Sequence, residues 1–179
     1  STWAAEHFYL SAESSYVEGK WEAFPFQIAI MDCISNDDIE SITWIKSARV
    51  GNTKIMLAAI GYFAEHKKRN QAVWQPVDED EEDFVKTEVD PMLRDGPAGR
   101  GVFPWFDKKH KNNTMRQKVF SSSKTLHLRG GKAAKNYRRI SVDTAYMDEL
   151  DINNKLPIKC VAKGTYRNFG DRFNLKNFD

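Results

Sequence analysis

The chain has 179 residues, of which 41% are hydrophobic and 29% are charged, and its formal net charge is +2. These values are typical of one globular domain with a continuous core and exclude an intrinsically disordered chain. Two cysteines are too few for a disulfide framework, and no cysteine or histidine grouping has zinc-site spacing. No apolar run approaches the roughly 18 residues of a membrane span, so we expect a cytoplasmic protein without membrane association.

Charge is unevenly distributed along the chain. Residues 78–83 read DEDEED, whereas residues 121–142 contain no acid and six basic residues. Further basic side chains lie just upstream, at Lys108, Lys109, Lys111, Arg116 and Lys118. Such segregation predicts either an electrostatic footprint for a polyanion or a solvated face.

The first half of the chain alternates between strand and helix signals. Residues 41–46 (SITWIK) are β-prone, and a loop with one glycine leads into the helix-compatible residues 52–67. Residues 71–77 (QAVWQPV) predict a second strand, and Asp78 can cap the next helix, which Pro91 disturbs. Strands alternating with helices at this spacing predict an α/β fold with a parallel sheet.

The second half is less regular. Residues 94–113 contain several glycines and prolines and predict a loop. Residues 115–120 and 125–128 predict a hairpin around a turn at 121–123. A short helix is expected at 133–139, and a strand at 141–147 leads directly into Asp148 and Glu149.

The loop after the first strand partly matches a phosphate-binding loop, G-x-x-x-x-G-K-[ST], in which backbone N–H groups surround phosphates. Aligning Gly51 with the second glycine puts Thr53 at the hydroxyl position, but Lys46 then replaces the first glycine and Asn52 replaces the lysine. Cations nevertheless flank the loop on both sides, and the guanidinium of Arg49 can bind phosphate oxygens bidentately. The alternative is an ordinary strand-to-helix turn with basic residues.

Asp148 and Glu149 favour the first alternative. A Mg-ATP site needs a carboxylate at a strand end to hold the metal ion, and a neighbouring glutamate often orients the attacking water. The pair follows a mostly apolar run about 95 residues after the loop. The loop and the acidic pair together predict an ATPase.

Several segments resemble the ATPase domain of large terminase subunits of the phage lambda type. They are KSARVGNTK, GGKAAKNYRRISVD, ESSYVEGKWEAFPFQ and FAEHKKRN, and the shared order runs from about Trp3 to Leu150. In that family a lysine begins the loop where other P-loops have glycine. The resemblance implies a three-layer P-loop NTPase fold of the RecA-like type with a mostly parallel central sheet, spanning residues 1–150.

The resemblance also implies roles for individual residues. Lys46 would bind phosphate at the start of a displaced Walker A motif, and Arg49 would sense the γ-phosphate during catalysis. Thr53 and the Walker B residue Asp148 would bind Mg²⁺, and Glu149 would be the catalytic base. The other loop residues of the nucleotide-binding set would be Ser47, Ala48, Val50, Gly51, Asn52 and Lys54.

Two residues near the start would contact the base of ATP. Gln27, in Pro25-Phe26-Gln27, resembles the adenine-recognition glutamine of terminases and helicases, and its amide suits the N6/N7 edge. Tyr16 would stack on the base. The alternative for both is a core or surface position on an N-terminal helix.

The resemblance implies a motor that pumps double-stranded DNA into an empty capsid shell. Its partners would be DNA, the small terminase subunit and the capsid portal, and we expect a monomer in isolation that forms a ring on the portal. Four basic residues would contact DNA, supply an arginine to a neighbour's nucleotide, or lie on a solvated face: Lys132, Lys135, Arg138 and Arg139.

Residues 151–179 do not continue the resemblance. They contain a β-prone run, KCVAKGTY, but no clustered aspartates of a two-metal nuclease, so we predict no nuclease activity for this chain. Two alternatives to the motor remain open. One is a non-catalytic fragment that binds DNA or portal, and the other is a helicase-like translocase, which would need a second RecA-like domain.

Overall fold

The computed structural model describes residues 1–13, 17–47, 49–106, 109–138, 140–148 and 158–166. Its helices are α1 (Thr2–His7), α2 (Pro25–Ser35), α3 (Asn52–Glu65), α4 (Asp78–Phe84), α5 (Asp90–Asp95) and α6 (Pro97–Val102), with a π-helical turn η1 (Val85–Val89) and a 3-10 turn η2 (Ala134–Tyr137). Its strands are β1 (Tyr9–Leu10), β2 (Gly19–Lys20), β3 (Ser41–Ile45), β4 (Gln71–Gln75), β5 (Asn113–Thr114), β6 (Gln117–Val119), β7 (Thr125–Gly130), β8 (Val142–Met147) and β9 (Ile158–Tyr166). The expected strands at 41–46, 71–77 and 141–147 and the expected helix at 52–67 are confirmed to within two residues.

The main sheet has seven strands in the order β3-β9-β8-β4-β7-β6-β5, and β1 and β2 form a separate pair. β4 pairs in parallel with β7 and β8. The other pairings in the sheet, β3 with β9, β9 with β8, β7 with β6 and β6 with β5, are antiparallel. The sheet of this α/β chain is therefore mixed, and the expectation of a mostly parallel sheet is wrong.

Short connections explain the antiparallel pairings. β5, β6 and β7 follow one another through turns, as the hairpin around residues 121–123 predicts. Only residues 148–157 separate β8 from β9, whereas a parallel crossover needs a dozen or more residues. β9 contains the β-prone run of the segment 151–179, and it takes the position between β3 and β8.

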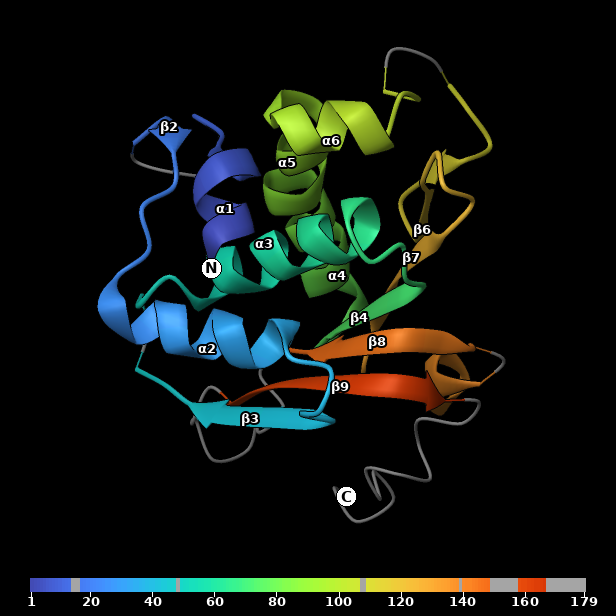
Figure 1. The fold of residues 1–179 in the computed structure, drawn as a ribbon. Coiled ribbons are helices and arrows are strands. Elements are labelled where there is room, and N and C mark those ends of the chain that lie inside the picture. The colour runs from blue at the N-terminus through green and yellow to red at the C-terminus, as the bar shows by residue number, and fades with distance from the viewer. Residues whose placement is uncertain (14–16, 48, 107–108, 139, 149–157, 167–179) are drawn as a thin grey trace.

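The main hydrophobic core lies between one face of the sheet and the helices. Figure 1 shows α3 between the sheet and the group formed by α1, α5 and α6. Because α3 is covered on both sides, 10 of its 14 residues are buried. Within the described ranges, no helix combines the length and the apolar composition that a membrane crossing requires.

A second, smaller core lies on the opposite face of the sheet. Successive side chains of a strand point to opposite faces, so Val73 of β4 joins the main core while Ala72 and Trp74 join the second one. Ile140 and Tyr137, from the segment before β8, pack against them. Both faces of β4 are therefore covered, which explains why this strand is buried along its whole length.

Two expectations for local structure are wrong. Residues 97–102 form α6 rather than a loop. Pro97 is compatible with this helix because it stands in the first turn, where the N–H that proline lacks would have no partner inside the helix. Asp78 is the first residue of α4 and not its cap, since Val77 occupies that position. Pro91 lies in the first turn of α5, directly after the π-helical turn η1, so the α-helical pattern is disturbed next to this proline, as expected.

His127 in β7 makes the stability of this fold depend on pH. Burial, together with the charge of Arg129, lowers the pKa of His127 from 6.5 to about 4. The unfolded chain therefore binds this proton more tightly, and His127 costs stability as the pH falls from 6.5 towards 4. When the pH is lowered from 7 to 4.5, we expect the unfolding free energy to fall in both proteins. The fall should be roughly 2 kcal/mol smaller for His127→Gln than for wild type. Urea unfolding at both pH values measures this difference, and equal losses would contradict it.

Candidate functional site

The loop between β3 and α3 contains two residues in the left-handed backbone region. Arg49 has a φ of 59° and Gly51 a φ of 78°. Glycine adopts this conformation freely, whereas a non-glycine residue held there is strained, and such strain clusters at ligand-binding sites. Gly51 is also the N-cap of α3, and its carbonyl accepts the N–H of Lys54 at 3.0 Å. The N-terminus of α3, with the positive end of its helix dipole, therefore lies at the end of this loop.

Gln27 holds the loop against the start of α2. Its side chain is 1% exposed. Its Nε2 donates to the carbonyl of Val50 at 3.0 Å, and its Oε1 accepts the N–H of Phe24 at 2.9 Å. The predicted adenine-reading residue thus lies beside the loop, but both ends of its amide are bonded to the backbone.

Asn52 occupies the position at which the usual phosphate-loop pattern has lysine. It is 4% exposed, and neither atom of its amide has a hydrogen-bond partner among the described residues. An unpaired buried amide costs about 1–3 kcal/mol, and either an ordered water or a bound ligand can complete its hydrogen bonds. The oxygens of a phosphate can accept from this amide, and the adjoining helix N-terminus favours an anion.

Replacing Gly51 with alanine is expected to destabilise the chain by about 2–3 kcal/mol. Alanine is strained at a φ of 78°, and its Cβ would lie 2.7 Å from Nε2 of Gln27, which must then release Val50. Gly101→Ala is the matched control, since a Cβ there meets no atom within 4 Å and alanine favours the helix. Urea unfolding of both variants measures the difference. Similar stabilities would show that the loop does not need this backbone conformation.

Asp148 directly follows β8 at the same edge of the sheet as the loop. β9 pairs with both β8 and β3, and in this register Met147 of β8 and Thr43 of β3 lie opposite the same residue of β9. Asp148 is therefore level with Trp44 and roughly 10 Å away across two strand spacings. Lys46 follows Trp44 by two residues, just beyond the end of β3. The loop and this carboxylate are brought to one edge of the sheet but are separated by a strand.

Most of the predicted site residues lie together. Those in or next to the loop are Lys46, Ser47, Arg49, Val50, Gly51, Asn52, Thr53 and Lys54. Four others lie outside the described residues: Tyr16, Ala48, Arg139 and Glu149.

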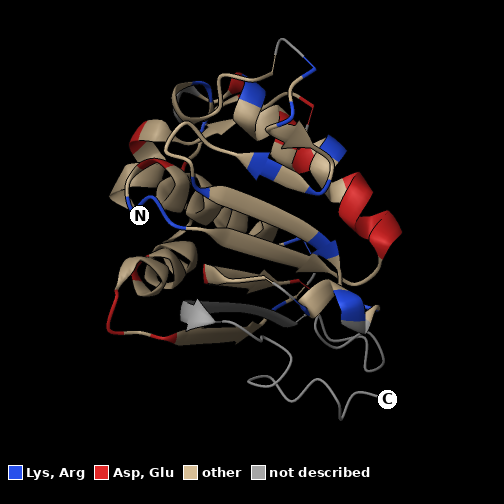
Figure 2. Ribbon diagram, turned by 90° about the vertical axis from the view of Figure 1, so that its right-hand side faces the viewer, with Lys and Arg blue, Asp and Glu red and all other residues tan. Residues whose placement is uncertain are grey.

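The basic side chains predicted to meet DNA or a neighbour's nucleotide are exposed around η2, at Lys132, Lys135 and Arg138. Trp74 fixes η2 to the sheet. Its ring stacks on Tyr137 with centroids 5.4 Å apart, and its Nε1 donates to the carbonyl of Asn136 at 3.2 Å. Figure 2 shows the contrast between the acidic α4, almost continuously red, and the Lys and Arg residues distributed over helices, strands and loops.

Lys118 does not belong to a polyanion-binding surface, contrary to expectation. It is 1% exposed, and its Nζ lies 2.7 Å from Oδ1 of Asp90 and 2.6 Å from Oδ1 of Asn113. Arg116 also faces acidic groups, with its Nε 3.9 Å from Oε2 of the buried Glu81. Burial raises the pKa of Glu81, and the charge of Arg116 opposes that rise. These cations attach β6 and its turn to the acidic helices.

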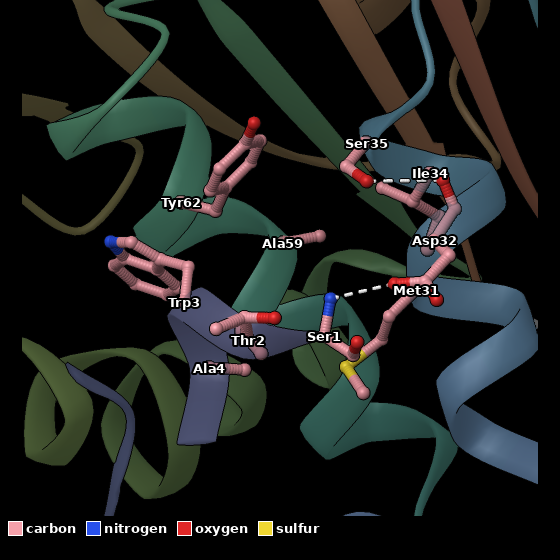
Figure 3. A pocket seen from close by; sticks show the side chains of 11 residues that line it. Ser1, Thr2, Trp3, Ala4, Met31, Asp32, Ile34, Ser35, Ala59 and Tyr62 are labelled. Carbon is pink, nitrogen blue, oxygen red and sulfur yellow. Dashed lines mark hydrogen bonds and ion pairs between the residues drawn. The ribbon is translucent and has the colours of Figure 1, made fainter. Parts of the chain in front are cut away.

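A cavity of about 300 Å³ lies away from the loop, among α1, α2 and α3 (Figure 3). Trp3, Met31 and Tyr62 contribute to its lining, and the amino group of Ser1 pairs with Asp32 at 2.8 Å beside it. None of the predicted site residues lines this cavity. It is therefore a feature separate from the candidate site.

One ion pair at the loop could not be expected from the sequence. Nζ of Lys54 lies 2.6 Å from Oε2 of Glu88, and the two side chains are 15% and 21% exposed. Glu88 is 34 residues away from Lys54 in the chain. In the sequence, the opposite charge of the two residues is the only indication that they could be in contact.

Comparison with known proteins shows the family of the chain. Residues 15–164 match the family described as phage terminase large subunit gpA, ATPase domain, and the chain belongs to this family. It is 51% identical to the terminase large subunit of Enterobacteria phage P21 over 148 residues, which are 83% of this chain and 23% of that protein.

A second large subunit, that of Escherichia phage lambda, is 49% identical over 148 residues with the same coverage. The chain thus spans about a quarter of the length of these two relatives. A shorter stretch of 43 residues, 24% of this chain, is 42% identical to Protein TfaD of Escherichia coli K12, over 23% of that protein. No solved structure matches the chain significantly.

Proposed function

We propose that this chain is the Mg²⁺-dependent ATP-hydrolysing part of a viral DNA-packaging motor, with a P-loop NTPase fold. The observation that carries the proposal is the loop from Lys46 to Lys54, in a chain of an ATPase-domain family. Its left-handed Arg49 and Gly51, the helix N-terminus behind it and the unpaired buried amide of Asn52 suit a polyphosphate. The left-handed backbone alone would also suit an ordinary turn, since Lys68 and Ser123 share it, so the buried amide of Asn52 carries more weight.

The phosphates would be bound by groups at the two ends and the middle of the loop. Lys46 and Arg49 would stabilise the negative charge that develops on the β- and γ-phosphates as the terminal bond breaks. Glu149 would orient the attacking water and accept its proton. Because phosphoryl transfer depends mainly on position and charge, catalysis would need little more than these side chains and Mg²⁺.

Mg²⁺ would be held by the Thr53 hydroxyl and the Asp148 carboxylate. The described residues contain no group of three or more His, Cys, Asp or Glu side chains suited to a metal ion. Mg²⁺ in ATPases needs no such group, because one or two protein oxygens, water and the nucleotide phosphates complete its shell. When bound, the ion would neutralise phosphate charge.

The adenine would lie near the start of α2, beside Gln27 and Tyr16. The Gln27 amide is engaged with Phe24 and Val50. Reading the adenine edge would therefore require Gln27 to share or exchange one of these bonds. This arrangement would connect base recognition directly to the conformation of the phosphate loop.

Double-stranded DNA would be the translocated substrate, and the exposed cations around η2 supply a surface for its phosphates or for a neighbouring nucleotide. The small terminase subunit and the portal would be the protein partners, with a monomer in isolation and a ring on the portal. The motor would act in the host cytoplasm.

Steady-state phosphate release, measured with and without double-stranded DNA, tests this function. We expect hydrolysis that requires Mg²⁺ and rises with DNA, and a DNA effect that weakens as salt increases. Binding of an ATP analogue without hydrolysis would instead favour the non-catalytic DNA- or portal-binding alternative. Strong stimulation by single-stranded DNA alone would favour a helicase-like translocase.

A further inference from the structure

The contact between Lys54 and Glu88 brings a carboxylate to the phosphate loop. Lys54 lies in the first turn of α3, and side chains on a helix point back towards its N-terminus. Because Lys54 is the third residue of α3, its ammonium is within reach of the loop end at which a phosphate would bind. The carboxylate of Glu88, at 2.6 Å, places a negative charge beside that ammonium.

Glu88 lies on a segment that is fixed in place on its other sides. It belongs to the π-helical turn η1, whose Val85 and Val89 are fully buried. Asp90, the first residue after η1, pairs with the buried Lys118 of β6, with Oδ1 of Asp90 2.7 Å from Nζ of Lys118. A π-helical turn inside a longer helical segment often marks a functional site. Glu88 is therefore held at Lys54 by the packing of η1, and not by the ion pair alone.

We infer that Glu88 is a positioning residue that competes with the nucleotide phosphates for Lys54 and so weakens nucleotide binding. This inference rests on the proposed function, because it assumes that the loop binds a polyphosphate. A carboxylate so close to an anion site repels the incoming phosphate and neutralises one of the cations that would attract it. Both effects favour release of the bound nucleotide over its retention.

Glu88→Gln tests the inference, because it removes the charge and keeps the shape. We expect it to bind Mg-ADP and inorganic tripolyphosphate roughly three- to tenfold more tightly than wild type, by titration calorimetry at low salt. A purely structural role for Glu88 predicts equal or weaker binding. The gain should shrink as salt is raised, since it is electrostatic.

Glu82→Gln is the matched control. Glu82 lies on the preceding helix and pairs with Lys86 at 3.6 Å, but its side chain is 56% exposed and the pair does not involve the loop. We expect wild-type affinity for this variant. If Glu88→Gln fails to fold, Glu88→Asp provides a second test, because it withdraws the carboxylate by one methylene and should tighten binding about twofold.

The outcomes separate the inference from the proposed function. If wild type binds neither Mg-ADP nor tripolyphosphate, the function and the inference both fail. If wild type binds but Glu88→Gln and Glu88→Asp bind equally well or more weakly, only the inference fails. Tighter binding by the Glu88 variants, with Glu82→Gln unchanged, supports it.

Discussion

Replacing Lys46 with glutamine is expected to lower ATP hydrolysis by at least roughly a hundredfold. Lys46 follows β3 directly and is only half-buried, so its ammonium can be removed without opening the core. Glutamine retains most of the length of the side chain but cannot offset the charge of the β- and γ-phosphates. Initial rates of phosphate release at saturating Mg-ATP measure the effect, and urea unfolding checks that stability is preserved.

A lysine elsewhere on the surface serves as the control for this variant. Lys20 in β2 is exposed and lies outside the loop, so Lys20→Gln should hydrolyse ATP as wild type does. Near wild-type turnover by Lys46→Gln would contradict the assignment of the phosphate-binding lysine. An equal loss in both variants would point to a general effect of net charge.

The largest effect on stability is expected for Trp74→Ala, about 3–5 kcal/mol. Trp74 is 2% exposed and packs between the sheet and η2. Its carbonyl accepts the N–H of Asp148 at 3.0 Å, while its side chain holds Tyr137 and Asn136. Loss of the indole would leave a cavity and release η2, which carries the exposed cations, next to the strand end that presents Asp148.

Trp74→Phe separates the two contributions of this side chain. Phenylalanine can keep the stacking on Tyr137 but loses the hydrogen bond to Asn136, so a cost of about 1–2 kcal/mol is expected. Chemical denaturation of the three proteins measures the series. If Trp74→Ala cost no more than Trp74→Phe, the ring would not be the element that fixes η2.

The parts of the fold that depend on local pattern could be predicted from the sequence. β3, α3, β4 and β8 were expected because apolar residues follow strand or helix periodicity between clear turn signals. The boundaries of η2 and the hairpin of β6 and β7 follow from similar signals. The loop at residues 46–54 can be singled out for the same reason, because its residues are contiguous between a strand and a helix.

The parts that depend on contacts between distant segments could not be predicted. The direction and position of β9 follow from the length of the connection after β8 and from the open place beside β3, neither of which local periodicity encodes. Lys118 belongs to a basic run, but Asp90 and Asn113 draw it into the interior. Its charge alone could not distinguish a buried pair from a surface footprint.

The site shows the same division. Gln27 was singled out by residue type and by resemblance, yet its bond to Val50 depends on how α2 packs against the loop. Glu88 was not singled out at all, because a glutamate in an acidic segment carries no local signal for one particular lysine. Asp148 was correctly placed at a strand end, while the strand between it and the loop was not foreseen.

Calorimetric titration with a non-hydrolysable ATP analogue and Mg²⁺ tests most directly whether the loop beginning at Lys46 binds the phosphates of a nucleotide. We predict that wild type binds one nucleotide per chain and that Lys46→Gln binds at least tenfold more weakly, with unchanged unfolding behaviour. No binding by wild type, or equal affinity in the two proteins, would contradict the claim.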